Sequence, residues 1–294
     1  MKFPESIFPF LLRATGANKP YISAEGAEVR IRELQNRPVP FHPPKNLHPN
    51  VTVTLRRLVT TPVYTVTPAT SRPTGHVIYA HGGGYVHEIS PHHWKLIAQI
   101  AADANTTVTV PIYELLPYGN AERTNALIVE LFNAAKVEQA NVSLAGDSAG
   151  GQIALSAAIT LRDQGHSGIR TVLISPLLDL TLSNPEIAAV VPHDPWLGVE
   201  GLRALGMRWA GNLSMNDPKA SPLMGDLHDL GPMFILTGTH DILNPDARLL
   251  ASKAKAAATD VNLLERRNAI HVFPLLPTRS VAPARALICD ALRV

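Results

Sequence analysis

The sequence has few of the residues on which several classes of protein depend. One cysteine, Cys289, occurs in 294 residues, which excludes an intrachain disulfide framework and favours a cytoplasmic location. This cysteine lies in an amphipathic stretch, so we expect it to be buried and apolar in role. Only 17% of the residues are charged and the formal net charge is +2, so we expect no nucleic-acid partner.

Metal ligands and long hydrophobic segments are scarce as well. His92 and His93 are adjacent, but no second cluster of ligand residues lies near them in the sequence, so we expect no metal. The apolar segment 1–13 is interrupted by Glu5 and two prolines and is too short to span a membrane. We therefore expect no stable membrane insertion, and we predict that this segment is a helix or loop that covers the functional site.

One glycine-rich segment has the pattern of a turn that carries a nucleophilic serine. Residues 146–150 read Gly-Asp-Ser-Ala-Gly and lie between a short apolar run and a helix-compatible run rich in small residues. A serine at such a strand-to-helix junction sits on a strained turn, where Cβ atoms at Gly146 and Gly150 would not fit. The N–H groups at the start of the helix favour the negative charge of a tetrahedral intermediate. Ser148 is therefore the predicted nucleophile.

A second glycine-rich segment, far away in the sequence, fits the same chemistry. Residues 81–84 read His-Gly-Gly-Gly and directly follow an apolar run at 75–80 that we predict to be a buried strand. Consecutive glycines let the backbone approach a reacting atom and present N–H groups to it. We predict that the N–H groups of Gly83, Gly84 and Ala149 bind an oxyanion. Together the two segments indicate ester or amide hydrolysis.

A serine nucleophile also needs a base, and the base needs an acid to orient it. The chain has 12 histidines, so position must decide between them. Apolar strand patterns at 232–237 and 261–265 are followed by Asp241 and His271, in the order serine, acid, histidine that the α/β-hydrolase arrangement requires. We predict Asp241 as the acid and His271 as the base. Asp147 adjoins the serine, but its side chain should diverge from it, which favours a structural role.

These segments together resemble the hormone-sensitive-lipase-like branch of the α/β-hydrolases, which includes the bacterial family IV carboxylesterases. The resemblance runs from about residue 75 to the C-terminus and rests on residues 81–84, 146–150, 217–223 and 238–243, with His271 beyond. It implies a Ser148–His271–Asp241 triad that requires no cofactor. It also implies supporting roles for His81, Gly82 and Asp147, with His81 holding the glycine loop rather than transferring protons.

Two positions depart from the family pattern. Residues 113–118 read Tyr-Glu-Leu-Leu-Pro-Tyr, where members of the family usually carry Tyr-Arg-Leu-Ala-Pro-Glu. Ala269 occupies a position that commonly holds glycine, two residues before the histidine. Neither change removes a catalytic group.

The spacing of apolar runs predicts the fold. Strands are expected near 52–59, 63–67, 75–80, 106–110, 141–145, 169–174, 232–238 and 261–265, and helices near 92–104, 121–140, 150–164, 244–259 and 280–293. This pattern indicates an α/β-hydrolase fold with an eight-stranded, mostly parallel sheet that begins with an antiparallel hairpin and has helices on both faces. We predict one catalytic domain, residues 51–294.

Two segments have no place in that sheet, and the resemblance implies that they form a helical cap. They are residues 1–50 and an insertion at about 181–225. Apolar residues of the insertion are expected to line or back the pocket, or to form the core of the cap. They are Pro195, Trp196, Leu197, Leu205, Met207, Trp209 and Met215.

Three functions remain open at this point. The first is a serine carboxylesterase that hydrolyses short- to medium-chain acyl esters, with a small-molecule ester as its substrate. The second is an amidase such as an arylformamidase, which shares the triad and the glycine loop. The third is a non-catalytic homologue that binds a small ligand, which the presence of His271 disfavours. A homodimer is compatible with the family resemblance.

Overall fold

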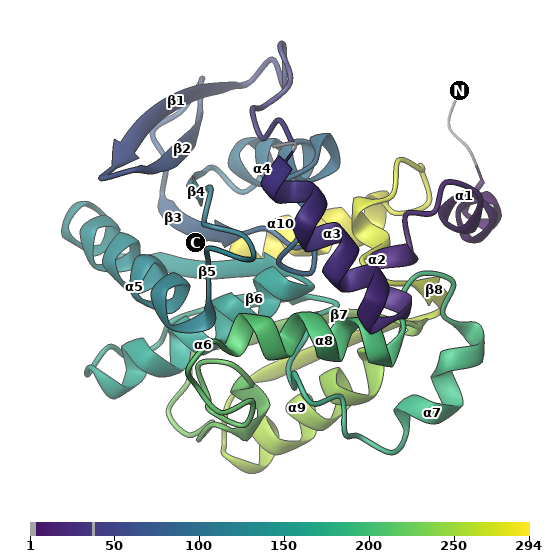
Figure 1. Ribbon diagram of the computed structural model, residues 1–294. Coiled ribbons are helices and arrows are strands. Elements are labelled where there is room, and N and C mark those ends of the chain that lie inside the picture. The colour runs from purple at the N-terminus through teal and green to yellow at the C-terminus, as the bar shows by residue number, and fades with distance from the viewer. Residues whose placement is uncertain (1–3, 37–38) are drawn as a thin grey trace.

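One sheet of eight strands forms the centre of the computed structural model, which describes residues 4–36 and 39–294 (Figure 1). The strands are β1 (Val51–Leu58), β2 (Thr61–Pro68), β3 (Gly75–Ala80), β4 (Thr106–Pro111), β5 (Val142–Asp147), β6 (Thr171–Ile174), β7 (Met233–His240) and β8 (Val261–Ile270). Their order in the sheet is β1-β2-β4-β3-β5-β6-β7-β8. Residues 1–3 and 37–38, which belong to the predicted N-terminal part of the cap, lie outside the described residues.

The directions of the strands confirm the predicted mostly parallel sheet. β2 runs antiparallel to β1 and to β4, and all the other neighbouring pairs are parallel. Because β3 and β5 are parallel and pair Ala80 with Gly146, the two glycine-rich segments emerge side by side from the same edge of the sheet. The interior strands are almost fully buried, as expected where helices cover both faces.

The last strand is longer than the sequence predicted. β8 extends to Ile270, whereas the apolar run ends at Glu265, and Ile270 pairs with His240 beyond an irregularity in β7. β8 lies at the edge of the sheet, and the side chains of residues 265–268 are mostly exposed or half-buried. Charged residues are compatible with an edge strand, so a criterion based on apolar runs ends such a strand too early.

Helices cover the two faces of the sheet. The α-helices are α1 (Phe8–Ala14), α2 (Lys19–Ile22), α3 (Ala24–Asn36), α4 (Pro91–Asp103), α5 (Ala121–Glu138), α6 (Ala149–Asp163), α7 (Ile187–Val190), α8 (Val199–Ala210), α9 (Asn244–Ala256) and α10 (Ala282–Leu292). Short 3-10 helices lie at Glu5–Ile7, Val191–His193, Pro222–Met224 and Phe273–Leu275. α4 and α10 pack together on one face, and α5, α6 and α9 lie on the other. In the described part of the chain, no helix is long and apolar enough to cross a membrane.

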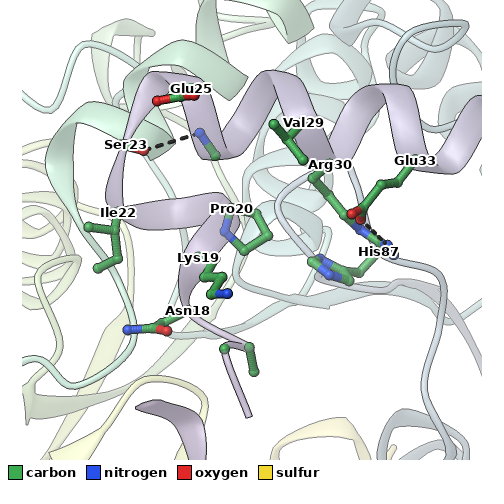
Figure 2. Close-up of a pocket in the computed structure, with 13 residues that line it drawn as sticks. Asn18, Lys19, Pro20, Ile22, Ser23, Glu25, Val29, Arg30, Glu33 and His87 are labelled. Atoms are coloured by element: carbon green, nitrogen blue, oxygen red, sulfur yellow. Dashed lines mark hydrogen bonds and ion pairs between the residues drawn. The ribbon is translucent and has the colours of Figure 1, made fainter. Parts of the chain in front are cut away.

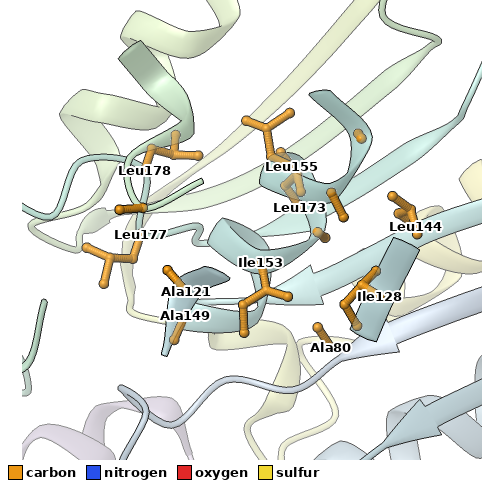
Figure 3. Packing of buried hydrophobic residues seen from close by; sticks show 14 of the residues in the cluster. Ala80, Ala121, Ile128, Leu144, Ala149, Ile153, Leu155, Leu173, Leu177 and Leu178 are labelled. Carbon is orange, nitrogen blue, oxygen red and sulfur yellow. The ribbon is translucent and has the colours of Figure 1, made fainter. Parts of the chain in front are cut away.

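The helix that follows the nucleophile packs into the larger of the two cores. Figure 3 shows Ile153 and Leu155 of α6 among Ile128 of α5 and Leu144 and Leu173 of the sheet. The start of α6 is made of small residues because the sheet is so close. A Cβ atom on Gly150 would lie 2.0 Å from the carbonyl oxygen of Ala80, and one on Gly146 would lie 2.2 Å from the carbonyl oxygen of Gly150. The predicted need for glycine on both sides of Ser148 is confirmed.

The segments outside the sheet pack against each other. α2 and α3, from the N-terminal region, contact α8, from the insertion after β6 (Figure 1). The backbones of α2 and α8 approach closely, since a Cβ atom on Gly201 would lie 2.3 Å from the carbonyl carbon of Tyr21. Trp209 of α8 is fully buried and stacks on Tyr85, with ring centroids 4.2 Å apart. This aromatic pair joins the helices above the sheet to the chain that follows the glycine loop.

We expect Trp209→Ala to lower the free energy of unfolding by about 3–5 kcal/mol, because the change empties a buried site and removes the stacked ring. Met207→Ala is the matched control, since Met207 lies on the same helix and is 61% exposed, and it should change stability by less than about 0.5 kcal/mol. Urea unfolding of both variants measures the difference. Equal losses would show that α8 is not anchored through Trp209.

Candidate active site

Ser148 lies at the sharp turn between β5 and α6. Its backbone has φ 52° and ψ −121°, a conformation that side-chain-bearing residues rarely adopt. The turn is fixed from both sides, because the N–H of Ser148 donates to the carbonyl of Ile174 at 2.8 Å, and its own carbonyl accepts from the N–H of Leu177 at 3.0 Å. The strained turn projects the hydroxyl away from the strand and the helix.

The structure brings the three predicted triad residues together. The hydroxyl of Ser148 is 2.9 Å from Nε2 of His271, and Nδ1 of His271 is 2.9 Å from Oδ2 of Asp241. The other carboxylate oxygen of Asp241 accepts the N–H of Leu243 at 3.0 Å. All three residues are buried, and Asp241 is completely inaccessible to solvent. This continuous chain of hydrogen bonds leaves Nε2 free to accept the hydroxyl proton of Ser148.

The environment of His271 raises its pKa. Burial alone would lower the pKa, but the charge of Asp241 and the hydrogen bond to it outweigh the burial. Asp194 acts in the same direction, although more weakly. The ring edge of Trp196 also meets the imidazole, with centroids 5.7 Å apart and planes at 83°.

A second buried carboxylate, which the sequence analysis did not single out, lies beside the triad acid. Asp194 accepts the N–H groups of Trp196 and Leu197 through Oδ1 and that of Ile242 through Oδ2, at 2.8 to 2.9 Å. Burial, and then the charge of Asp241, raise the pKa of Asp194 to about 6. Asp194 thus ties the insertion to the residue that follows Asp241. In the sequence, the only local feature that marks Asp194 is the proline that follows it.

The glycine loop lies against the turn that carries Ser148. A Cβ atom on Gly82 would lie 3.0 Å from the Cβ of Ser148, and Gly83 and Gly84 have φ values of 124° and 58°, which favour glycine. Within the described residues, the N–H groups of Gly83, Gly84 and Ala149 donate to no protein acceptor. The N–H of Gly82 is occupied instead, by Asp147 at 3.1 Å. Gly83 and Gly84 also line the cavity onto which Ser148 opens.

Asp147 clamps the loop to the turn. Its Oδ1 accepts the hydroxyl of Tyr79 at 2.8 Å as well as the N–H of Gly82, and its Oδ2 lies 3.1 Å from Nε2 of His93. The N–H of Ser90 donates to Nδ1 of His93 at 3.0 Å, which assigns the proton of the neutral imidazole to Nε2. Burial works to raise the pKa of Asp147, but His93 and the hydrogen bonds outweigh it, so the pKa is lowered.

His81, the first residue of the glycine loop, makes structural contacts. His81 is fully buried and stacks on Tyr113, whose hydroxyl donates to the carbonyl of His81 at 2.7 Å. Burial lowers the pKa of His81 to about 4. Residues 113–118 depart from the family pattern, but their first residue, Tyr113, thus still supports the glycine loop. Their second residue, Glu114, forms an exposed ion pair with Arg123 at 2.8 Å.

Gln152 links three parts of the site. No pattern in the sequence had indicated this role. Oε1 of Gln152 accepts the hydroxyl of Tyr85 and the indole N–H of Trp209, each at 3.1 Å. Its Nε2 donates to the carbonyl of Lys219 at 2.7 Å. The residue lies one turn into α6 among small apolar side chains, and its partners come from separate segments, so no local pattern indicates its role.

A cavity of about 400 Å³ opens onto Ser148 and His271. Trp196 and Leu197 line it, as expected for apolar residues of the insertion. Leu205 and Trp209 belong instead to the core beneath it. The expectation for Met207 was wrong, because this residue lies on the solvent-exposed side of α8.

A larger hollow of about 630 Å³ lies outside this cavity, along α2 and α3 (Figure 2). His87 and Ala17 border both spaces, and the hydroxyl of Tyr21 is 2.8 Å from Nδ1 of His87. Arg30 lies on the outer side, where it donates to the carbonyl of Val86 and pairs with Glu33. Lys19 and Arg30 therefore border the outer hollow and do not line the cavity at Ser148.

Comparisons with known proteins identify the family to which the chain belongs. Residues 77–275 match the model of a family described by the alpha/beta hydrolase fold. A triacylglycerol lipase of Mycobacterium tuberculosis is 34% identical over 218 residues, which are 73% of this chain and 45% of the lipase, so the chain spans less than half of that relative. An acetyl-hydrolase of Streptomyces hygroscopicus is 30% identical over 225 residues, 73% of this chain and 75% of the relative.

A solved structure extends the likeness to the whole chain. The crystal structure of an esterase from the bacterial hormone-sensitive lipase family matches with a TM-score of 0.81 and 25% identity, covering 100% of this chain and 98% of the esterase. The protein therefore belongs to the hormone-sensitive-lipase-like family of α/β-hydrolases, whose characterised relatives include esterases and lipases.

We expect Asp147→Asn to lower the free energy of unfolding by about 2–4 kcal/mol, because an amide has one oxygen and its NH₂ group would face a donor. Urea unfolding at neutral pH measures the loss. Since the pKa of Asp147 is lowered in the folded state, its ionisation stabilises the fold above its unfolded pKa, and this stabilisation is lost as the pH falls through the folded pKa. Asp260→Asn, at an exposed position, is the control and should have little effect.

Proposed function

We propose that the protein is a serine carboxylesterase that hydrolyses short- to medium-chain acyl esters. The observation that carries the proposal is the hydrogen-bonded chain from Ser148 through His271 to Asp241, at 2.9 Å for each contact. The volume of the cavity, about 400 Å³, lies toward the lower end of the range for small-molecule sites and supports a small substrate.

The proposed mechanism assigns each group a role. Nε2 of His271 removes the proton of Ser148 as its oxygen attacks the ester carbonyl, while Asp241 orients the imidazole and stabilises its protonated form. The N–H groups of Gly83, Gly84 and Ala149 stabilise the oxyanion. His271 then protonates the leaving alcohol, and water, activated by the same imidazole, releases the acid from the acyl-enzyme.

The cap belongs to the same proposal. We assign residues 1–50 and 181–225 to one cap and residues 51–294, apart from this insertion, to the catalytic domain. The contacts of α2 and α3 with α8 support the assignment. A cytoplasmic location, suggested by the single cysteine, and a homodimer remain predictions of the sequence.

A panel of p-nitrophenyl esters of increasing chain length tests the function. We expect Ser148→Ala and His271→Ala each to lower kcat by about 10⁴-fold or more, and Asp241→Asn to lower it by roughly 10³ to 10⁴-fold. His228→Ala, which changes an exposed histidine, is the control and should keep full activity. Full activity of Ser148→Ala would refute the assignment. Faster hydrolysis of an N-formyl arylamine than of an aryl acetate would identify an amidase instead.

The pH dependence gives a separate test of the base. Activity requires neutral His271, and its pKa is raised in the folded protein, so kcat/KM should fall on the acidic side with an apparent pKa above the value of about 6.5 for a free imidazole. The residual activity of Asp241→Asn should show a lower apparent pKa, because the strongest effect that raises it is gone. An apparent pKa that is unchanged in this variant would contradict the proposed pairing.

A further inference from the structure

The cavity contains a carboxylate that the proposed mechanism does not use. Glu88 lines the same cavity as Ser148 and His271, four residues beyond the glycine loop. Its Oε2 is inaccessible to solvent and has no hydrogen-bond partner among the described residues, although the side chain as a whole is half-buried. A carboxylate in this condition is costly, because burial removes water that nothing in the protein replaces.

The residues around Glu88 do not neutralise it. Burial raises the pKa of Glu88 to about 7, and no neighbouring charge offsets the effect of burial. None of the described residues that line the cavity is a lysine or an arginine, and Arg30 is held on the outer side by Val86 and Glu33. Among residues 4–36 and 39–294, no cationic side chain of the lining therefore faces the carboxylate of Glu88.

The other ionisable groups of the cavity are accounted for. Asp147 is occupied by Tyr79, Gly82 and His93. Burial lowers the pKa of His87 to about 4 and also lowers the pKa of His92, so both shifts favour the neutral imidazole. Among the described lining residues, Glu88 is thus the carboxylate that remains available to a ligand.

We propose that Glu88 receives a positively charged group of the substrate, so that the preferred esters carry an ammonium group in their acyl or alcohol part. The inference rests on the proposed esterase function, which places the substrate in this cavity. Attraction between opposite charges is stronger at such a half-buried site than in bulk water, because part of the surrounding water is replaced by protein. The same carboxylate disfavours anionic esters.

Matched pairs of esters isolate the charge. Choline butyrate and neohexyl butyrate differ only in an ammonium nitrogen or a carbon atom in the alcohol part. The p-nitrophenyl ester of γ-butyrobetaine and its carbon isostere differ in the same way in the acyl part. At about pH 8, where Glu88 is mostly ionised, we expect the cationic member of at least one pair to have a kcat/KM at least ~10-fold higher.

The variants assign that preference to one residue. In Glu88→Gln, which keeps the shape of the side chain, the ratio of cationic to neutral kcat/KM should fall by about 10-fold or more. Glu130→Gln removes the same charge from an exposed position on α5 and should keep the ratio of the wild type. The inference is overturned if the wild type prefers neither cationic ester, or if Glu88→Gln retains the preference.

Binding separates this inference from the function on which it rests. Calorimetry with Ser148→Ala measures the affinity for the intact esters without hydrolysis, and addition of Glu88→Gln in the same chain should remove the preference for the cationic member. If the preference appears in binding but the wild type hydrolyses no ester, the proposed function fails and the role of Glu88 stands. If the wild type hydrolyses the neutral esters and shows no preference in rate or binding, only the role of Glu88 fails.

Discussion

The buried carboxylate of Asp147 is the contact on which the rest of the site depends. It belongs to the same turn as Ser148, and its oxygens bind the N–H of Gly82 and the side chains of Tyr79 and His93. The positions of the strained turn and of the glycine loop are therefore not independent. The N–H of Gly82 is bound to Asp147, and the next two residues of the loop, Gly83 and Gly84, line the cavity with N–H groups that have no protein acceptor among the described residues. Preorganised donors of this kind need no rearrangement when charge develops.

A similar coupling exists on the acid side of the site. Asp194 comes from the insertion after β6, and it binds the N–H of Ile242, which adjoins Asp241. Two buried carboxylates close to each other raise the energy of the ionised state, and the pKa of Asp194 is raised for this reason as well as by burial. Three backbone N–H groups compensate part of this cost. The insertion is thus held by the same backbone that positions the triad acid, and movement of one would disturb the other.

The sequence predicted the parts of the site that depend on local geometry. Ser148, Asp241 and His271 each follow a strand, and parallel strands end at a common edge, so their meeting could be expected from the strand pattern together with the serine, acid, histidine order of the α/β-hydrolases. Asp194, Gln152 and Glu88 could not be assigned in this way, because their environments are made by segments distant in the chain. The length of β8 was also missed, since charged side chains on an edge strand interrupt the apolar pattern without ending the pairing.

The residues with a local sequence pattern and those without one bear differently on substrate specificity. The residues with a sequence pattern would build a reactive centre that serves many esters, and the side chains of Ser148, His271 and Asp241 find their hydrogen-bond partners within the protein. Oε2 of Glu88 lacks a partner within the described chain, whereas the other carboxylate that lines the cavity, Asp147, is bound by Tyr79, Gly82 and His93. Native proteins pair nearly all their buried polar groups, so an unpaired carboxylate oxygen in the cavity onto which Ser148 opens points to a partner outside the chain. The proposed cationic group of a substrate would supply that partner.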